Sequence, residues 1–205
     1  MSKRTLRPYE SRQRAPAAAA SRLAMLDAAR DLFSRQGVDK VTIVEIAARA
    51  DVSASTVYAV FGSKEGILRE LMRTALFGPR FREAQSLLDG VSDPVERVAR
   101  TAQVARAIYE SEVADLGGLR GLSAFSPALR QLEEEFEAVR YDMQRDRLEA
   151  LAASARMKPG LALDDARRIM WMYTGREVYR MLVDVGGWSA DKYQAWLGAA
   201  LVDAL

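Results

Sequence analysis

Hydroxyl, phenol and cationic side chains are concentrated between residues 42 and 64 of this 205-residue chain. Each of these groups can donate a hydrogen bond to a phosphate oxygen or to the edge of a base. The members of this group are Thr42, Arg49, Ser53, Ser55, Thr56, Tyr58 and Lys64. Their chemistry is that of nucleic-acid recognition rather than of substrate transformation.

The amino-acid composition excludes most classes of catalytic site. The chain contains no His and no Cys, which excludes histidine general bases, Ser-His and Cys-His pairs, disulfides and thiolate metal sites. Adjacent carboxylates such as Asp164 and Asp165 are typical of helix caps and solvated faces. We therefore expect no enzymatic activity, no cofactor and no metal site.

Two short helices joined by a tight turn are predicted to position the polar side chains. Thr42 and Glu45 form a T-x-x-E capping box at the start of the first helix. Ser53 is placed to cap the second helix, which we expect from about Ala54 to Val60. This arrangement is the outline of a helix-turn-helix, a motif that places its second helix in a DNA groove.

Lys64 stands in the first turn of a further predicted helix, which Ser63 is placed to cap. A cation at this position opposes the positive end of the helix dipole. A DNA phosphate would relieve that conflict and would also meet free backbone N–H groups. The alternative interpretation is a solvated lysine with a small energetic cost.

Residues 22–72 resemble the N-terminal domain of the tetracycline-repressor (TetR) family. Four segments in order carry the resemblance, LDAARDLFSRQG, TIVEIAARA, VSASTVY and FGSKE. The resemblance implies an all-helical, homodimeric transcriptional regulator, usually a repressor that a small ligand releases. It also implies a ligand pocket inside the C-terminal helical domain and a dimer interface formed by the last two long helices.

The sequence departs from the family pattern in the turn and in the second helix. Asp51 stands where the family usually has glycine, although aspartate tolerates a positive φ better than most residues. The second helix has no Lys, Arg, Asn or Gln, so bidentate reading of guanine or adenine from it is not available. We expect base edges to be faced by Ser53, Ser55, Thr56 and Ala59. We expect phosphates to be held by Thr42, Arg49, Tyr58 and Lys64.

The net charge of +2 is unevenly distributed. Residues 1–64 carry eleven Lys or Arg and six Asp or Glu, a net charge of +5, whereas the remainder has a net charge of −3. Neutralisation of a DNA backbone requires such a basic part. Residues 1–16 are predicted to be a disordered basic tail, which either touches phosphates or a minor groove or only solubilises the chain.

The fold class is predicted to be all-α, with about nine helices. Residues 17–78 should form the helix-turn-helix DNA-binding domain, and residues 79–205 a helical ligand-binding and dimerisation domain. Turn and capping signals place the longer helices at about 18–36, 64–77, 94–109, 111–125, 127–155 and 164–186, with a last helix capped by Ser189. No membrane-spanning run is present in the sequence.

The partner and the ligand are predicted less directly. The helix at 164–186 is apolar on more than one face, which favours a homodimer formed by it and the last helix; an internal core that needs no partner is the alternative. By resemblance, the candidate pocket residues are Phe77, Phe81, Tyr109, Phe125, Phe136, Met143, Trp171 and Tyr173. Arg140 and Arg176 either anchor an acidic ligand or pair with nearby glutamates.

These observations lead to one functional expectation. The chain should be a ligand-responsive transcriptional regulator, a repressor that binds a palindromic double-stranded DNA operator as a homodimer and is released by a small molecule. A DNA-binding architectural protein without ligand sensing is the alternative. In either case we expect a bacterial cytoplasmic protein at the nucleoid, without a membrane partner.

Overall fold

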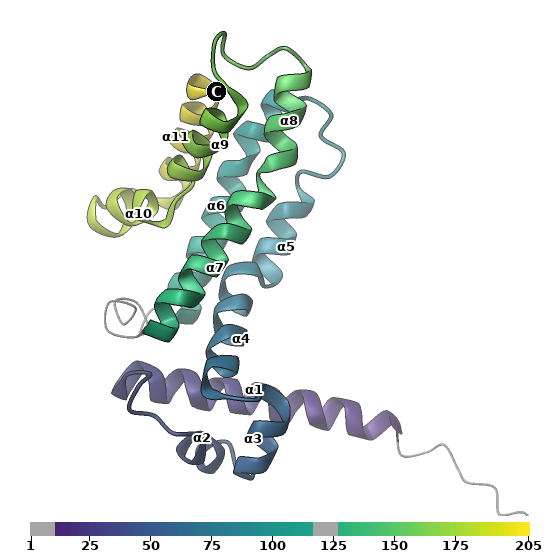
Figure 1. The fold of residues 1–205 in the computed structure, drawn as a ribbon, viewed down its shortest axis with the longest axis vertical. Coiled ribbons are helices and arrows are strands. Elements are labelled where there is room, and N and C mark those ends of the chain that lie inside the picture. Colours follow the sequence, from purple (N-terminus) through teal and green to yellow (C-terminus); the bar gives the residue numbers. More distant parts are fainter. Residues whose placement is uncertain (1–10, 117–126) are drawn as a thin grey trace, which may run out of the picture. The chain divides into compact units, whose positions relative to one another are not determined.

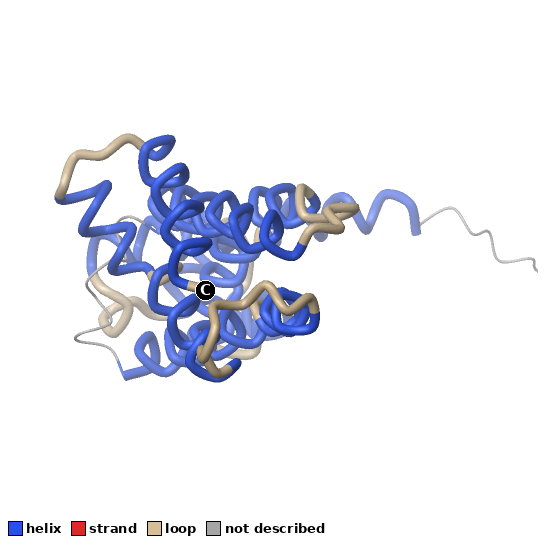
Figure 2. The backbone as a smooth tube through the Cα atoms, turned by 90° about the horizontal axis from the view of Figure 1, so that it is seen from above, coloured by secondary structure: helices blue, strands red, loops and turns tan. Residues whose placement is uncertain are grey.

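The computed structural model describes residues 11–116 and 127–205, and within them every regular element is a helix (Figures 1 and 2). The predicted all-α class is therefore confirmed. The chain divides into two compact units, whose described parts are residues 11–71 with 127–129 and residues 72–116 with 130–205. The division falls inside a helix that runs to Phe77, slightly before the boundary expected at residue 78.

The first unit is built on three helices and the first half of a fourth. Its core side chains are fully buried and come from all four, including Met25, Phe33, Ile46, Val57 and Leu68. Arg22 connects the elements from the outside, because its guanidinium stacks on the Phe61 ring at 4.8 Å and pairs with Glu70 at 3.1 Å. The helices are α1 (Ser11–Gln36), α2 (Ile43–Arg49), α3 (Ala54–Phe61) and α4 (Lys64–Phe77).

Helix α1 begins earlier than predicted. We expected a helix from residue 18 after a disordered tail to residue 16, whereas α1 begins at Ser11 and contains Pro16. The alanine run at 17–20 is the strongest helix-forming sequence available and extends the helix toward the N-terminus. Pro16, the sixth residue of α1, removes one backbone hydrogen bond and crowds the carbonyl four residues earlier, a cost that the rest of this 26-residue helix offsets. The rest of the predicted tail, residues 1–10, lies outside the described residues.

The turns of the first unit follow the local sequence. Gly37 ends α1 with a φ of 86°, the left-handed conformation that glycine adopts most readily. Asp51, in the turn between α2 and α3, has a φ of 54°. The aspartate therefore takes the positive φ that a glycine commonly supplies at this position. Ser63 accepts a hydrogen bond from the Gly66 N–H at 3.1 Å and caps α4 as predicted.

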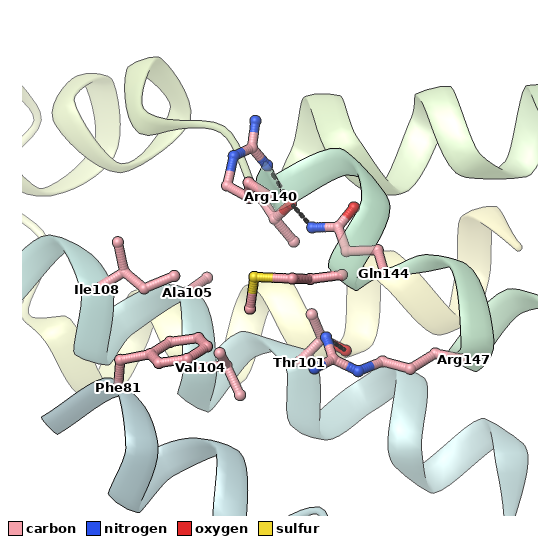
Figure 3. A pocket seen from close by; sticks show the side chains of 10 residues that line it. Phe81, Thr101, Val104, Ala105, Ile108, Arg140, Gln144 and Arg147 are labelled. Atoms are coloured by element: carbon pink, nitrogen blue, oxygen red, sulfur yellow. Dashed lines mark hydrogen bonds between the residues drawn. The ribbon is translucent and has the colours of Figure 1, made fainter. Parts of the chain in front are cut away.

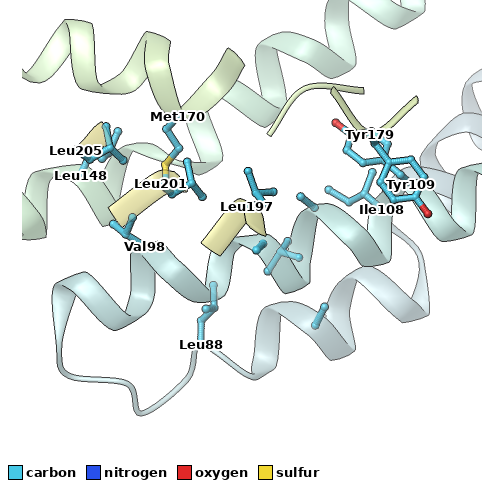
Figure 4. Close-up of a cluster of buried hydrophobic side chains, with 14 of the residues drawn as sticks. Leu88, Val98, Ile108, Tyr109, Leu148, Met170, Tyr179, Leu197, Leu201 and Leu205 are labelled. Atoms are coloured by element: carbon cyan, nitrogen blue, oxygen red, sulfur yellow. The ribbon is translucent and has the colours of Figure 1, made fainter. Parts of the chain in front are cut away.

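The second unit packs its helices around one apolar cluster (Figure 4). Helices α6 and α11 form its most extensive pairing, and they approach closely at Gly198, where an added Cβ would lie 3.2 Å from the Ala99 carbonyl oxygen. Leu148 and Met170 complete the cluster from α8 and α9. The helices are α5 (Pro79–Ser86), α6 (Pro94–Leu116), α7 (Pro127–Met143), α8 (Arg145–Ala153), α9 (Leu163–Tyr173), α10 (Arg176–Tyr179), a π-helix η3 (Arg180–Val185) and α11 (Ala190–Ala204).

Three predicted helix boundaries in this unit are wrong. Helix α6 continues from Pro94 to Leu116 instead of ending near Tyr109. The predicted helix 127–155 is interrupted at Gln144, and the predicted helix 164–186 is interrupted at Thr174 and Gly175. The helix predicted at 111–125 falls largely outside the described residues. Within the described ranges, no helix combines the length and the apolar character needed to cross a membrane.

Candidate nucleic-acid interface and internal cavity

The start of α2 forms the predicted capping box. The Thr42 hydroxyl accepts a hydrogen bond from the Glu45 N–H at 3.2 Å, and the Glu45 carboxylate accepts from the Thr42 N–H at 2.7 Å. These bonds to Thr42 lower the pKa of Glu45 below its ordinary value. The Thr42 hydroxyl also donates to Glu45 at 2.8 Å. Its hydrogen is thus already engaged within the protein.

The start of α3 carries three hydroxyl groups, of which that of Ser53 contacts the other two. Ser53 caps the helix by accepting from the Thr56 N–H at 3.1 Å. Its Oγ also lies 2.8 Å from the Ser55 Oγ and 2.7 Å from the Thr56 Oγ1. Each hydroxyl can rotate to donate or to accept. The positive end of α3 therefore presents an adaptable hydrogen-bonding group, defined here as the hydroxyl cluster Ser53, Ser55 and Thr56.

The next turn of α3 is exposed and less polar. Tyr58 is 54% exposed, Val60 is 38% exposed and Ala59 is also exposed. On α2, Val44 is 67% exposed. Neither valine was among the predicted contact residues, because the exposure of each became known only from the structure. Methyl groups on such a surface can contact the methyl group of thymine.

Arg49 is held at the end of α2 by a shared carboxylate. Its Nη2 lies 2.6 Å from the Asp31 Oδ2, while the Arg35 Nε lies 2.6 Å from the Asp31 Oδ1. Both arginine side chains are more than half exposed. Two guanidinium groups on one carboxylate leave a net positive charge at the surface, which is what a phosphate requires. Arg35 was not predicted to take part.

Lys64 has a different environment from the one predicted. Its Nζ donates to the backbone carbonyl oxygens of Asp39 at 3.2 Å and Val41 at 3.1 Å. These carbonyls stabilise the ammonium group, so the conflict with the dipole of α4 is resolved inside the protein. An ammonium group has three N–H donors, and the two bonds leave one of them for another partner.

An internal cavity lies within the second unit (Figure 3). Its volume is about 20 Å³, close to the roughly 10–15 Å³ that one water molecule needs. The apolar part of its wall consists of Phe81, Val104, Ala105, Ile108 and Met143. The polar part consists of Thr101, Arg140, Gln144, Arg147 and Thr174.

Two of the eight predicted pocket residues line this cavity, namely Phe81 and Met143. Five of the others are described and pack against other neighbours. Phe77 packs against Phe81 and Phe136, with ring centroids 5.3 and 5.6 Å away. Phe125 lies outside the described residues.

The remaining three aromatic residues face other neighbours. Tyr109 is buried against the Tyr179 ring, and its hydroxyl donates to the Thr174 carbonyl oxygen at 2.7 Å. Burial raises the pKa of Tyr109 well above its ordinary value. Trp171 is 38% exposed and donates to Glu137, and Tyr173 packs against Trp196.

The buried side chains of Arg140 and Gln144 both bind the hydroxyl of Thr174 in the polar part of the cavity wall. The Thr174 Oγ1 accepts hydrogen bonds from the Arg140 Nη1 at 2.8 Å and from the Gln144 Nε2 at 2.7 Å. The same hydroxyl donates to the Met170 carbonyl oxygen at 2.7 Å. The other end of the Gln144 amide, Oε1, is buried without a hydrogen-bond partner. One acceptor beside the cavity is therefore unsatisfied.

Arg140 is buried and Arg176 is partly buried, and carboxylates balance the charge of both. Arg140 pairs with Glu137, and Arg176 pairs with Glu112 at 3.1 Å and with Glu133 at 3.2 Å. Of the two roles considered for Arg140 and Arg176, the structure shows the pairing with glutamates.

Arg147 was not singled out by sequence reasoning. It is 4% exposed, and its guanidinium donates to the Gln85 Oε1 at 2.9 Å and to the Thr101 Oγ1 at 3.4 Å. Burial and the nearby Arg97 lower the pKa of Arg147 to about 10. The signal that could have identified it is its spacing: it stands four residues after Met143 and four before Leu151, on the buried face of the helix.

No group of three or more acidic side chains that could hold a metal ion occurs in the described part of the chain. The functional features are a capped pair of short helices with a basic surface in one unit and a small cavity with buried charges in its wall in the other. A helix-turn-helix with this capping and turn geometry defines the class of DNA-binding transcriptional regulators.

Comparison with known proteins identifies the family. The family described as "Bacterial regulatory proteins, tetR family" matches residues 25–71. The transcriptional regulator BetI of Agrobacterium fabrum (strain C58 / ATCC 33970) is 30% identical over 148 residues, which cover 72% of this chain and 68% of BetI. The chain belongs to the TetR family of transcriptional regulators.

Two further relatives are similar over different extents. The regulator HbdR of Aromatoleum sp. (strain CIB) is 32% identical over 88 residues, 43% of this chain, and the match spans only 38% of HbdR. The crystal structure of FadR from Bacillus subtilis in complex with stearoyl-CoA superposes with a TM-score of 0.66 at 19% identity, covering 89% of this chain and 98% of that one. At this identity the likeness to FadR concerns the fold.

Proposed function

We propose that the protein is a ligand-responsive repressor that binds a palindromic operator as a homodimer and is released by a small molecule. The observation that carries the DNA-binding part is the hydroxyl cluster Ser53, Ser55 and Thr56 at the exposed, positive end of α3. In this proposal the protein acts on the chromosome in the bacterial cytoplasm.

The proposed DNA contacts divide between base edges and backbone. Ser53, Ser55, Thr56 and Ala59 face base edges, and specificity comes from hydroxyl hydrogen bonds and thymine methyl contacts, since α3 has no Lys, Arg, Asn or Gln. Phosphates are held by Arg49, Tyr58 and Lys64, and Thr42 joins them only when its hydroxyl turns away from Glu45. Lys64 contributes through its third N–H, and Arg49 through the positive charge it shares with Arg35.

The proposed dimer uses the last helices. Large apolar side chains along them are exposed in the single chain, namely Met172, Met181, Val185 and Val202, with exposures of 54%, 53%, 71% and 40%. Exposed apolar surface of this kind marks an interaction site. In the proposed dimer, the two copies of α3 enter successive major grooves, about 34–36 Å apart.

The proposed release mechanism connects the cavity to α4. Phe81 lines the cavity and contacts Phe77, which is the last residue of α4. The same helix begins at Lys64, directly after the helix-turn-helix. A ligand that enlarges the cavity displaces Phe81 and, through Phe77, shifts α4. The ligand favours release only if it binds the released state more tightly.

One observation favours the alternative of a DNA-binding architectural protein without ligand sensing. The cavity of about 20 Å³ is far smaller than the roughly 300–1,000 Å³ of typical ligand pockets. A thermal-shift screen separates the two functions. A sensor is stabilised by at least one compound, and that compound weakens DNA binding; an architectural protein shows neither effect.

Genome-wide mapping of sites bound by the full-length protein tests the regulator itself. We expect a small number of palindromic sites upstream of genes, and weaker binding as salt concentration rises. Binding spread over the genome without an enriched sequence would contradict the proposal and support the architectural alternative.

A further inference from the structure

In the described interior of the second unit, the guanidinium of Arg147 has no ion pair, and Asp146 on the same helix acts on it only from beyond salt-bridge distance. The two hydrogen-bond acceptors of its guanidinium, Gln85 and Thr101, are both neutral. Among the described residues no carboxylate lies within salt-bridge distance of it, in contrast to Arg140 and Arg176. Arginine is almost never fully buried unless it is paired. The missing partner is an anion.

The cavity beside Arg147 changes in polarity from one end to the other (Figure 3). Phe81, Ala105 and Ile108 lie at one end, and Thr101 and Arg147 lie at the opposite end. A ligand that satisfies both ends has an apolar tail and a negatively charged head. The buried Gln144 Oε1, which has no partner, offers an additional acceptor to a ligand that carries a donor group.

The number of unbalanced charges limits the head group. Arg140 also lines the cavity, but Glu137 already balances its charge. Of the charged side chains that line the cavity, this leaves Arg147 without a carboxylate partner among the described residues, and a carboxylate ligand supplies two oxygens in the geometry of the guanidinium fork. Arg97, which lies near enough to lower the pKa of Arg147, does not line the cavity.

We propose that this cavity binds a small monocarboxylic acid with an apolar tail, with the carboxylate paired to Arg147. The proposal rests on the proposed ligand-responsive function and names the class of its ligand. The cavity must enlarge to admit the acid, and Met143 in its wall is suited to this, because an unbranched thioether side chain repacks readily.

The test is isothermal titration calorimetry of the full-length protein with butanoate, octanoate and benzoate, each compared with its neutral amide. We expect at least one acid to bind, and to bind about 10- to 100-fold more tightly than its amide, as a charge-assisted hydrogen-bonded pair requires. The absence of binding by all three acids at millimolar concentration, or equal binding of an acid and its amide, overturns the proposal.

Two variants identify the group responsible. Arg147→Gln should remove the preference for the acid over the amide, while Arg145→Gln, an exposed arginine on the same helix, should keep it. A preference that survives in Arg147→Gln overturns the assignment to Arg147. Arg147→Met serves as a second variant; it removes a buried, unpaired charge, so its melting temperature should equal or exceed that of the wild type. If neither variant folds, the comparison of acid and amide binding to the wild-type protein still tests the proposal.

A DNA-binding measurement on the same samples separates this proposal from the function it rests on. If the protein binds specific DNA but none of the acids, the proposed regulatory function is supported and the proposed ligand class is overturned. Acid binding that depends on Arg147 but leaves DNA binding unchanged supports the anion site and overturns release by this ligand.

Discussion

Gln144 donates a hydrogen bond of 2.7 Å to the hydroxyl of Thr174, across an interval of thirty residues. Gln144 separates α7 from α8, and Thr174 ends α9. The two interruptions in otherwise long helices are therefore joined by one buried contact in the cavity wall. A ligand that draws Gln144 toward itself would loosen the end of α9.

Replacing Thr174 by valine tests the importance of this junction. The substitution keeps the side-chain shape but removes the acceptor shared by Arg140 and Gln144, which leaves buried donors unsatisfied. We expect the free energy of unfolding to fall by about 1–3 kcal/mol, measured by urea denaturation. Thr74→Val, at an exposed position of α4, is the control and should change stability by less than about 0.5 kcal/mol. Equal stabilities of the two variants would show that the junction is not needed.

Replacing Ser55 by aspartate separates DNA binding from folding. The added carboxylate lies in the first turn of α3, where the helix dipole stabilises a negative charge by about 0.3–1 kcal/mol. The melting temperature should therefore be unchanged or higher. DNA binding should fall at least about tenfold, because the added carboxylate would enter the groove of a polyanion, as measured by fluorescence anisotropy. Ser92→Asp, an exposed position before α6, makes the same charge change away from α3 and should bind DNA normally. Undiminished binding by Ser55→Asp would exclude the start of α3 from the interface.

The features that sequence reasoning predicted depend on contacts between residues close in the chain. The capping box of Thr42 and Glu45, the cap at Ser53 and the positive φ of Asp51 each involve residues no more than three positions apart. Such geometry follows from residue type and spacing alone. The fold class and the helix-turn-helix followed from these local patterns together with the family resemblance.

The features that were missed depend on distant partners. Lys64 is held by carbonyls 23 and 25 residues away, and the helix interruptions at Gln144 and Thr174 are held by each other. The cavity was expected to be aromatic, yet its wall contains buried polar groups whose partners lie on other helices. The helical spacing of Arg147 indicates the buried face, but its partners Gln85 and Thr101 lie 62 and 46 residues away in the sequence.

The capping box gives the first unit a defined response to acid. Hydrogen bonds from Thr42 hold the pKa of Glu45 below its ordinary value, which is about 4.3 for an unperturbed glutamate. A carboxyl group whose pKa is lowered by folding stabilises the fold above its unfolded pKa, and this contribution is lost as the pH falls through the folded pKa.

NMR titration should show Glu45 ionising at lower pH than glutamate in an unstructured peptide. Thr42→Val should move the Glu45 pKa back toward the ordinary value; a Glu45 pKa that is ordinary in the wild type would rule out this role.

The exposed apolar residues of the last helices provide the test of the dimer. Val185 in η3 is 71% exposed, and in the proposed dimer it becomes buried against its symmetry mate. Val185→Lys would then bring two unpaired ammonium groups into an apolar contact, which is strongly unfavourable. Light scattering should find a dimer for the wild type and a monomer for the variant at micromolar concentration, with weaker binding to a two-half-site operator.

Val139→Lys, on α7 and 45% exposed, makes the same chemical change outside these helices and should remain dimeric. A monomeric wild type, or a dimer that survives Val185→Lys but not Val139→Lys, would place the interface elsewhere.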